Sequence, residues 1–242
     1  MFHKLKYYSK VNWVKTLYFN FKMFPFSVAI KLPVFFYGHV KFSNLSGTII
    51  LDVPTIERGM IGFGQPYEMI TTSAKTAELT LAGTLIFRGH CFFGKDYRIF
   101  IKEKATLEFG HMCTLGNSVK MFCTQEIRLA NYVQTGIDCL FTDTVFHPMI
   151  NTKTKEVYPM TGSVCIGNYN FIGFRTTIMK NTTTPNYCTI ASNSLCNTDY
   201  TALGTNILIG GIPAKLLKEN ITRDWDTEKN LLDQWLKLKN FL

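Results

Sequence analysis

The stretch from Ile166 to Thr201 reads IGNYNF, IGFRTT, IMKNTT, TPNYCT, IASNSL and CNTDYT, so one pattern returns every six residues. The first position of each unit, here called the leader, is held by Ile166, Ile172, Ile178, Thr184, Ile190 and Cys196. Four residues after each leader stands a smaller side chain: Asn170, Thr176, Thr182, Cys188, Ser194, and then the exception Tyr200. Two series in phase indicate a short strand and a tight turn, with the leader packed inward and the smaller residue beside it near a corner.

A period of six excludes the commoner architectures. An α-helix needs apolar residues three and four apart, and Thr, Asn and Gly are poor helix formers. A β-sandwich shows separate strands about every 8–12 residues. Gly167 and Gly173 directly follow their leaders, where backbone bends or packs closely. The pattern therefore predicts an all-β solenoid, a parallel β-helix whose coils form a prism and bury their faces against one another.

The same phase continues upstream. The segment LANYVQTG from Leu129 echoes IGNYNFIG from Ile166, which pairs Asn131 with Asn168 and Gly136 with Gly173. We expect the leaders of this region to be Asn117, Cys123, Leu129, Thr135 and Phe141. Earlier runs of period six are separated by a slip of two residues: Leu81, Phe87, Phe93 and Ile99, then Ile101, Leu107 and Cys113. We interpret such slips as loops or irregular corners.

The chain divides into three segments. Residues 1–50 form a basic, aromatic N-terminal extension, expected to be helical up to about Phe24. Residues 51–211 form the β-helix, and residues 212–242 form a C-terminal tail. The tail carries a helical apolar stripe, formed by Leu231, Leu232, Trp235, Leu236 and Leu238. We expect this C-terminal α-helix to pack on the solenoid and to pin it.

The chain of 242 residues has a formal net charge of +9, so its surface is expected to attract anions. The N-terminal stretch holds lysines with no acid among them: Lys4, Lys6, Lys10, Lys15, Lys22, Lys31 and Lys41. CoA, a sugar nucleotide or an anionic membrane face fits this charge equally well, whereas no nucleic-acid-binding signature is present. Peripheral membrane contact through the N-terminal region, and docking of its aromatic residues on the prism, are both open.

The seven cysteines are Cys91, Cys113, Cys123, Cys139, Cys165, Cys188 and Cys196. Their number is odd, no metal-type Cys pair occurs, and no signal peptide is recognisable. We therefore expect buried, reduced thiols in a cytoplasmic protein, with any membrane association peripheral and at the inner face. No apolar run approaches the roughly 20 residues that a membrane-spanning helix needs.

The period-six prism together with GGIPAK at residues 210–215 resembles the hexapeptide-repeat acetyltransferases. That group includes maltose and galactoside O-acetyltransferases, serine acetyltransferases and capsule or lipopolysaccharide biosynthesis acetyltransferases. The resemblance implies a left-handed coil, although crossovers between parallel strands are generally right-handed. It also implies a homotrimer that uses acetyl-CoA, with no metal, to O-acetylate a sugar or a surface-glycan precursor in clefts between neighbouring prisms.

The segment TDTVFHP, Thr142 to Pro148, interrupts the period and leads into a non-repetitive loop that ends at about Ser163. It resembles the family's segment ending in His-Pro, which implies His147 as the catalytic base. An imidazole titrates near neutral pH and therefore suits removal of a proton from an acceptor hydroxyl. The alternative is a loop histidine without a catalytic role.

The resemblance further implies acceptor contacts by Asn117 and Asp143. Val145 replaces the family's aspartate two places before the histidine, so Asp143 is the remaining candidate to orient the imidazole. For Asn117, an equal alternative is a bond to backbone at a corner.

The family's CoA site lies along the later coils and the tail, which implicates Gly173, Phe174, Ser192, Asn197, Thr198, Lys215 and Lys218. The extended pantetheine arm can bond exposed backbone of successive coils, and the lysines offer point charges to the phosphates. Thr198 stands where many relatives carry Lys, so one phosphate contact is absent or supplied elsewhere. A solvated basic turn is the alternative for the two lysines.

Three other functions are compatible with a β-helix. N-acetylation of an amino sugar or amino nucleotide-sugar is the nearest, and a non-catalytic scaffold that does not bind acetyl-CoA is the second. The third, a γ-type carbonic anhydrase, needs three zinc-binding histidines. No pair shows the close spacing of that site among the five histidines, which are His3, His39, His90, His111 and His147. The sequence therefore predicts no metal site.

Overall fold

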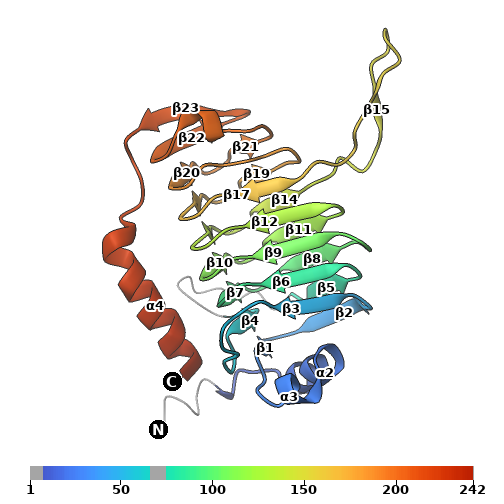
Figure 1. The fold of residues 1–242 in the computed structure, drawn as a ribbon, viewed down its shortest axis with the longest axis vertical. Coiled ribbons are helices and arrows are strands. Elements are labelled where there is room, and N and C mark those ends of the chain that lie inside the picture. Colours follow the sequence, from blue (N-terminus) through green and yellow to red (C-terminus); the bar gives the residue numbers. More distant parts are fainter. Residues whose placement is uncertain (1–7, 66–74, 242) are drawn as a thin grey trace.

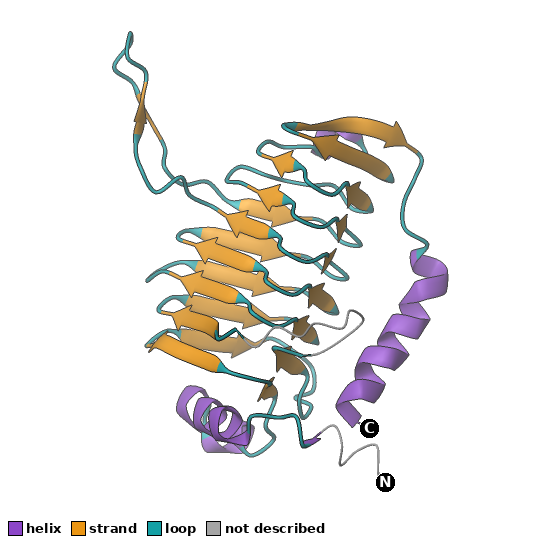
Figure 2. Cartoon of the chain, turned by 180° about the vertical axis from the view of Figure 1, so that it is seen from behind, coloured by secondary structure: helices purple, strands orange, loops and turns teal. Residues whose placement is uncertain are grey.

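The computed structural model describes residues 8–65 and 75–241, and its strands stack into the three faces of a prism, as Figures 1 and 2 show. Face 1 contains β1 (Val34–Phe36), β4 (Ile61–Phe63), β7 (Cys91–Phe93), β10 (Cys113–Leu115), β13 (Gln134–Thr135), β18 (Phe171–Ile172), β20 (Cys188–Ile190), β22 (Ile207–Gly211) and β23 (Ala214–Glu219). Face 2 contains β2 (Val40–Leu45), β5 (Ala77–Leu81), β8 (Arg98–Ile101), β11 (Lys120–Cys123), β14 (Leu140–Thr142), β19 (Thr177–Ile178) and β21 (Leu195–Cys196). Face 3 contains β3 (Thr48–Leu51), β6 (Thr84–Phe87), β9 (Thr106–Phe109), β12 (Glu126–Leu129) and β17 (Val164–Ile166).

Each coil visits face 1, face 2 and face 3 in turn, and the coils wind with a left hand. Neighbouring strands within the faces are parallel, apart from the antiparallel hairpin of β22 and β23 that closes face 1. The predicted all-β solenoid, a left-handed parallel β-helix with a C-terminal helix, is therefore confirmed.

The interior follows the two series read from residues 166–201. The six leaders are at most 3% exposed, and the smaller residues four places later are buried too. Several of the polar ones find partners inside: the Thr184 hydroxyl donates to Asn170 Oδ1 at 2.7 Å, and Asn170 Nδ2 donates to the Pro185 carbonyl at 2.8 Å. Tyr200, the exception in size, lies where the prism ends, and its hydroxyl donates to the Ala214 carbonyl of the closing hairpin at 3.4 Å.

The slip of two residues that we interpreted as a loop or an irregular corner lies inside β8, because this strand points both Ile99 and Ile101 inward. On face 3, Phe87 pairs with Phe109, and Phe109 pairs with Leu129, so these lower coils are longer than the three-hexad coil that separates Ile166 from Thr184. The extra residues lie between faces 2 and 3, at 102–105 and 124–125.

One expected leader is wrong, because Asn117 lies in the turn between β10 and β11. Met121, rather than Cys123, pairs with Phe141 on face 2, so Leu115 and Met121 hold the inward leader positions of that coil. The extra residues at 124–125 caused the shift in phase. Cys123 is buried as well, since the longer strands point two side chains inward.

The first coil consists of β1, β2 and β3 and spans residues 34–51, all but the last of which we assigned to the N-terminal extension. Its period was hard to recognise because residues 52–60 and 64–76 separate it from later strands. Before it, α2 (Trp13–Met23) and α3 (Phe26–Ala29) cover the end of the prism. None of the helices, over the residues described, is both long and apolar enough to cross a bilayer.

Helix α2 caps the free edge of β1 with two buried polar side chains. The Thr16 hydroxyl accepts from Phe36 N at 3.0 Å, and Asn20 exchanges two hydrogen bonds with the backbone of Val34 at 2.7 and 3.2 Å. An edge strand otherwise exposes such groups for pairing with another chain.

Helix α4 (Trp225–Phe241) runs along the outside of the solenoid beside face 1 (Figure 1), as predicted. Trp225 is buried against Phe92, Met112 and Tyr132, and the Tyr132 hydroxyl donates to the Asp233 carboxylate at 3.2 Å. The side chains of Trp235, Leu236 and Leu238, and residues His3, Lys4 and Lys6, lie outside the described part.

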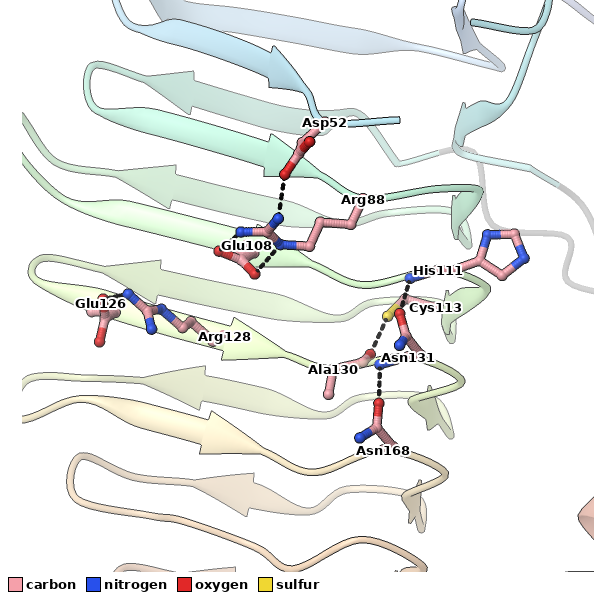
Figure 3. Close-up of polar contacts among 10 residues, drawn as sticks. All are labelled: Asp52, Arg88, Glu108, His111, Cys113, Glu126, Arg128, Ala130, Asn131 and Asn168. Carbon is pink, nitrogen blue, oxygen red and sulfur yellow. Dashed lines mark hydrogen bonds and ion pairs between the residues drawn. The ribbon is translucent and has the colours of Figure 1, made fainter. Parts of the chain in front are cut away.

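Polar ladders run along the outside of the prism (Figure 3). At the corner between faces 3 and 1, Asn131 Oδ1 accepts from His111 N at 2.7 Å, and Asn168 Oδ1 accepts from Asn131 N at 3.0 Å. The sequence echo of Asn131 and Asn168 is therefore a repeated corner bond. On face 3, Arg88 bridges Asp52 and Glu108 across three coils.

The cysteines provide a test of which side chains of the coils point into the prism and which point outward. All seven thiols are free and six are buried; Cys165 is partly exposed on the outer side of β17. Burial raises the pKa of Cys139 to about 11 and that of Cys188 and Cys196 to about 12. Because the thiolate is the reactive form, a thiol reagent at pH 8 should modify Cys165 alone in the folded protein, and slowly, since burial raises its pKa too.

Cys165→Ser should remove that reaction, and all seven thiols should react in denaturant. The folded chain keeps protons that the unfolded thiols release above about pH 8.5, so the free energy of unfolding should fall as pH rises past about 9. Native-state labelling of Cys113 or Cys123 would contradict the assigned phase.

Candidate functional site

An arm leaves the prism at the corner between faces 2 and 3, directly after β14, and projects away from the coils (Figures 1 and 2). Its two strands begin at the prism: Gly162 N donates to the Asp143 carbonyl at 3.0 Å, and Val145 N donates to the Met160 carbonyl at 3.0 Å. Farther out the arm is a hairpin of β15 (Met149–Ile150) and β16 (Val157–Tyr158). The non-repetitive loop expected between Pro148 and about Ser163 therefore forms most of this arm, which is hydrogen-bonded at its base.

His147 lies at the foot of this arm and is exposed. Phe146, just before it, has a φ of 61°, a conformation that bulky residues rarely adopt. Two contacts hold Phe146 there: its N–H donates to the Thr144 hydroxyl at 3.0 Å, and its ring meets Phe122 of face 2 edge-on at 6.0 Å. These contacts fix the backbone that leads into His147, whose side chain is exposed.

Asp143 does not orient His147. Its carboxylate is fully buried and accepts hydrogen bonds from the N–H groups of Thr124, Gln125 and Glu126 at 2.7–2.9 Å, and from the Thr124 hydroxyl at 2.8 Å. These donors belong to the irregular corner one coil below. Burial, and next the charge of Asp143, raise the pKa of the Cys123 thiol. Asp143 therefore stabilises the base of the arm instead of facing an acceptor.

Two more predicted residues lie at the same corner, two coils above Asp143. Asn197 and Thr198 follow β21 and are exposed. Between them and the arm lies Lys180, whose ammonium group donates to the Pro159 carbonyl of the arm. The neighbouring Asp199 carboxylate accepts from the N–H and hydroxyl of Thr201, which lowers its pKa. Sequence reasoning missed Lys180, which occupies a turn position of the repeat.

The remaining predicted coil residues lie at the other edge of face 2, the corner with face 1. Asn117 Oδ1 accepts from Lys95 N at 2.7 Å, which is the corner bond of the alternative interpretation. Ser192 Oγ accepts from Phe174 N at 3.0 Å. A Cβ at Gly173 would lie 2.5 Å from Ser192 N, so only glycine allows the coils to approach here.

Phe174 is 41% exposed, and its ring lies over Gly136 of the coil below, where a Cβ would approach the ring to 2.0 Å. Lys215 and Lys218 are exposed on β23, the last strand of face 1. The single chain therefore does not gather the predicted residues in one pocket. It divides them between the two edges of face 2 and the closing hairpin.

Coil stacking also joins residues that sequence spacing kept apart. The rings of His90 and His111, one coil apart, meet edge-on at 5.6 Å, and His90 Nε2 lies 3.5 Å from the Glu57 carboxylate. His90 and His111 are separated in sequence by about the length of one lower coil, and this spacing was the signal that could have revealed the pair. In the described part of the chain, no group of three or more His, Cys, Asp or Glu side chains is arranged to hold a metal ion.

Neither a protein-family model nor a curated protein sequence matches the chain. Among solved structures, it is similar to the polySia-specific acetyltransferase NeuO, with a TM-score of 0.50, 16% identity, and coverage of 85% of this chain and 87% of that one. It is also similar to AntD, an N-acyltransferase from Bacillus cereus in complex with dTDP and 3-hydroxybutyryl-CoA, with a TM-score of 0.42, 13% identity, and coverage of 86% and 88%.

A third similar structure is the UDP-N-acetylglucosamine O-acyltransferase LpxA from Moraxella catarrhalis, with a TM-score of 0.43, 11% identity, and coverage of 84% of this chain and 81% of that one. With so low a sequence identity, the similarity to NeuO shows a common fold.

The role of Asp143 can be tested by substitution. Asp143→Ala leaves three corner N–H groups without their acceptor, and Asp143→Asn presents amide hydrogens to donors. Because each unsatisfied buried group costs about 1–3 kcal/mol, both changes should lower the free energy of unfolding by at least about 2 kcal/mol in urea titrations. Asp226→Ala, at an exposed aspartate of α4, should change it by less than about 1 kcal/mol. A stable Asp143→Asn variant would contradict the structural role.

Proposed function

We propose that the chain is an acetyl-CoA-dependent O-acetyltransferase that acts on a sugar or a surface-glycan precursor, with His147 as general base. The observation that carries the proposal is the exposed imidazole of His147 at the foot of an arm that leaves a left-handed parallel β-helix. The fold shared with NeuO, an acetyltransferase specific for polySia, supports it.

The chemistry needs one imidazole and no covalent enzyme intermediate. His147 takes the proton of an acceptor hydroxyl while that oxygen attacks the thioester carbonyl carbon. The tetrahedral oxyanion requires hydrogen-bond donors, for which exposed backbone N–H groups at a coil corner are suited. When the C–S bond breaks, the imidazolium returns its proton to the leaving CoA thiolate, so the base is regenerated.

The division of the site across face 2 favours assembly between copies. Four apolar side chains of the hairpin, Met149, Ile150, Val157 and Tyr158, are 43–60% exposed. A two-stranded hairpin is at best marginally stable in water, so these side chains need a packing partner. We propose that the arm packs on a neighbouring prism in a homotrimer, so that His147 of one copy meets the Phe174 edge of the next.

Face 2 supplies a surface for that contact. Helix α4 covers face 1, and ion pairs lie on face 3 and on the lower coils of face 2. From its third coil upward, face 2 also points partly buried apolar side chains outward: Phe100, Phe122, Leu140, Met179 and Leu195. A contact between this face and the arm of the next copy is head-to-tail, and such contacts form a closed ring when the rotation between copies closes.

The pantetheine arm of CoA would follow the corner formed by Phe174 and Ser192, where coil backbone is exposed. We assign the phosphates to Lys215 and Lys218, because Thr198 lacks a charge and the neighbouring Asp199 carboxylate repels an anion. We propose an acceptor contact for the amide nitrogen of Asn117, whose oxygen is used by Lys95 N, and none for Asp143.

The base is tested by His147→Ala. Free-thiol release from acetyl-CoA with a sugar acceptor should fall by about 10²–10⁴, while CoA binding measured by calorimetry is retained. His39→Ala, at another exposed histidine, should leave turnover within about twofold. Undiminished activity of His147→Ala would refute the assignment.

Acceptors for this assay should pair each hydroxyl sugar with its amino analogue. If only the amino sugars are acetylated, the enzyme is an N-acetyltransferase and the O-acetyltransferase proposal is wrong. The absence of saturable acetyl-CoA binding to the wild-type chain would leave only the scaffold interpretation.

Arm packing is tested by changing Met149, Ile150, Val157 and Tyr158 together to Ser. The wild type should sediment as a trimer and the arm variant as a monomer at micromolar concentration, because each lost apolar contact weakens association by about 1–3 kcal/mol. The matched control changes Val14, Leu17, Phe26 and Ile30, apolar residues of comparable exposure, to Ser and should remain trimeric. A trimeric arm variant would contradict the proposal.

A further inference from the structure

Helix α2 has one face packed on the prism and an apolar face that is exposed. Its inner face buries Thr16, Phe19 and Asn20 against the first coil. On the outer face, Val14, Leu17, Tyr18 and Phe21 follow the spacing of one helical stripe and are 43–78% exposed. A helix that only capped the solenoid would place polar residues on that side.

The outer stripe continues onto α3. Phe26 is 72% exposed and lies against Phe21, with ring centroids 6.0 Å apart, and Ile30 is 50% exposed. We call these six side chains, Val14, Leu17, Tyr18, Phe21, Phe26 and Ile30, the cap surface. Contiguous exposed apolar surface of this kind marks an interaction site.

The charge around the cap surface selects among partners. Lys10, Lys22 and Lys31, which flank its residues in the sequence, are exposed, and Lys15 lies over the Phe42 ring at 5.0 Å. The first acidic residue of the sequence is Asp52. A second copy would bring the same lysines into opposition, whereas an anionic lipid surface would complement them.

The position of the cap surface also suits a flat partner. Helices α2 and α3 lie at one end of the solenoid, and the closing hairpin of β22 and β23 lies at the other (Figure 1). The arm leaves the fifth coil, four coil steps of about 4.8 Å from the first. A planar surface can therefore meet the cap end without meeting the arm.

We propose that the cap surface docks peripherally on an anionic lipid membrane. The apolar side chains enter the headgroup region, and the lysines lie against the lipid phosphates. Docking then holds His147 farther from the headgroups than the roughly 20 Å between its coil and the first coil, because the layer of α2 and α3 lies between the first coil and the membrane. The inference does not depend on the acetyltransferase proposal, since it rests on the cap alone.

The experiment is co-sedimentation of the full chain with vesicles of phosphatidylcholine that contain about 30% phosphatidylglycerol, compared with pure phosphatidylcholine, at about 50 mM salt. The chain should partition onto the anionic vesicles only, and high salt should release it. Lys22→Gln with Lys31→Gln should weaken partitioning about 30-fold. The matched control, Lys102→Gln with Lys104→Gln, removes two exposed lysines from a coil corner and should leave it unchanged.

Val14→Ser with Phe26→Ser should weaken partitioning at least about tenfold. Ile50→Ser, at an exposed apolar residue of face 3, should not. Equal loss in the control variants, or no preference for anionic vesicles, would overturn the proposal. So would a drop in oligomer mass on Val14→Ser with Phe26→Ser, because the cap surface would then be a contact between copies.

Discussion

The backbone ladder between coils is the constraint on which the rest of this structure depends. Each strand pairs in parallel with the strands one coil below and above, so a leader must stack on the leader of the neighbouring coil. The size of a coil then decides what fills it. The longer lower coils enclose stacked rings such as Phe63 on Phe93, with centroids 4.4 Å apart. The shorter coils of three hexads hold isoleucines with Asn, Thr and Ser, and Asn170, Thr184 and Ser194 form hydrogen bonds inside the prism.

A chain bound in this ladder can leave it only at a corner. Strand residues are fixed by neighbours on both sides, whereas a corner already contains turn residues and tolerates insertion. The arm leaves at such a point, and Asp143 shows how the exit is stabilised: one buried carboxylate satisfies three N–H groups of the corner below. His147 directly follows Phe146, whose backbone lies in the left-handed region. The exposed foot of the arm is thus attached to a base that these hydrogen bonds hold in place.

The same pairing between coils explains which features the sequence predicts and which it does not. The hexads of residues 166–201 predicted the inward positions because the upper coils have a single length. Lower coils differ in length, so the phase was lost at Asn117 and the first coil was missed. Asp143 looked like a partner for His147 because the two are close in sequence; its actual donors lie earlier in the chain, one coil below. The handedness came from the family resemblance, since the general rule for crossovers predicts the other hand.

Because the pairing between coils fixes the inward side chains, the outward side chains determine which surfaces can contact a partner. On face 1, outward side chains pack against α4, and on face 3 Arg88, Glu108, Glu126 and Arg128 form ion pairs. Face 2 is the face bordered by both the arm corner and the Phe174 corner. Packing through face 1 or face 3 would leave one of these edges away from the interface. Contact through face 2 places both edges at it, so the catalytic proposal and the proposed assembly stand on the same geometry.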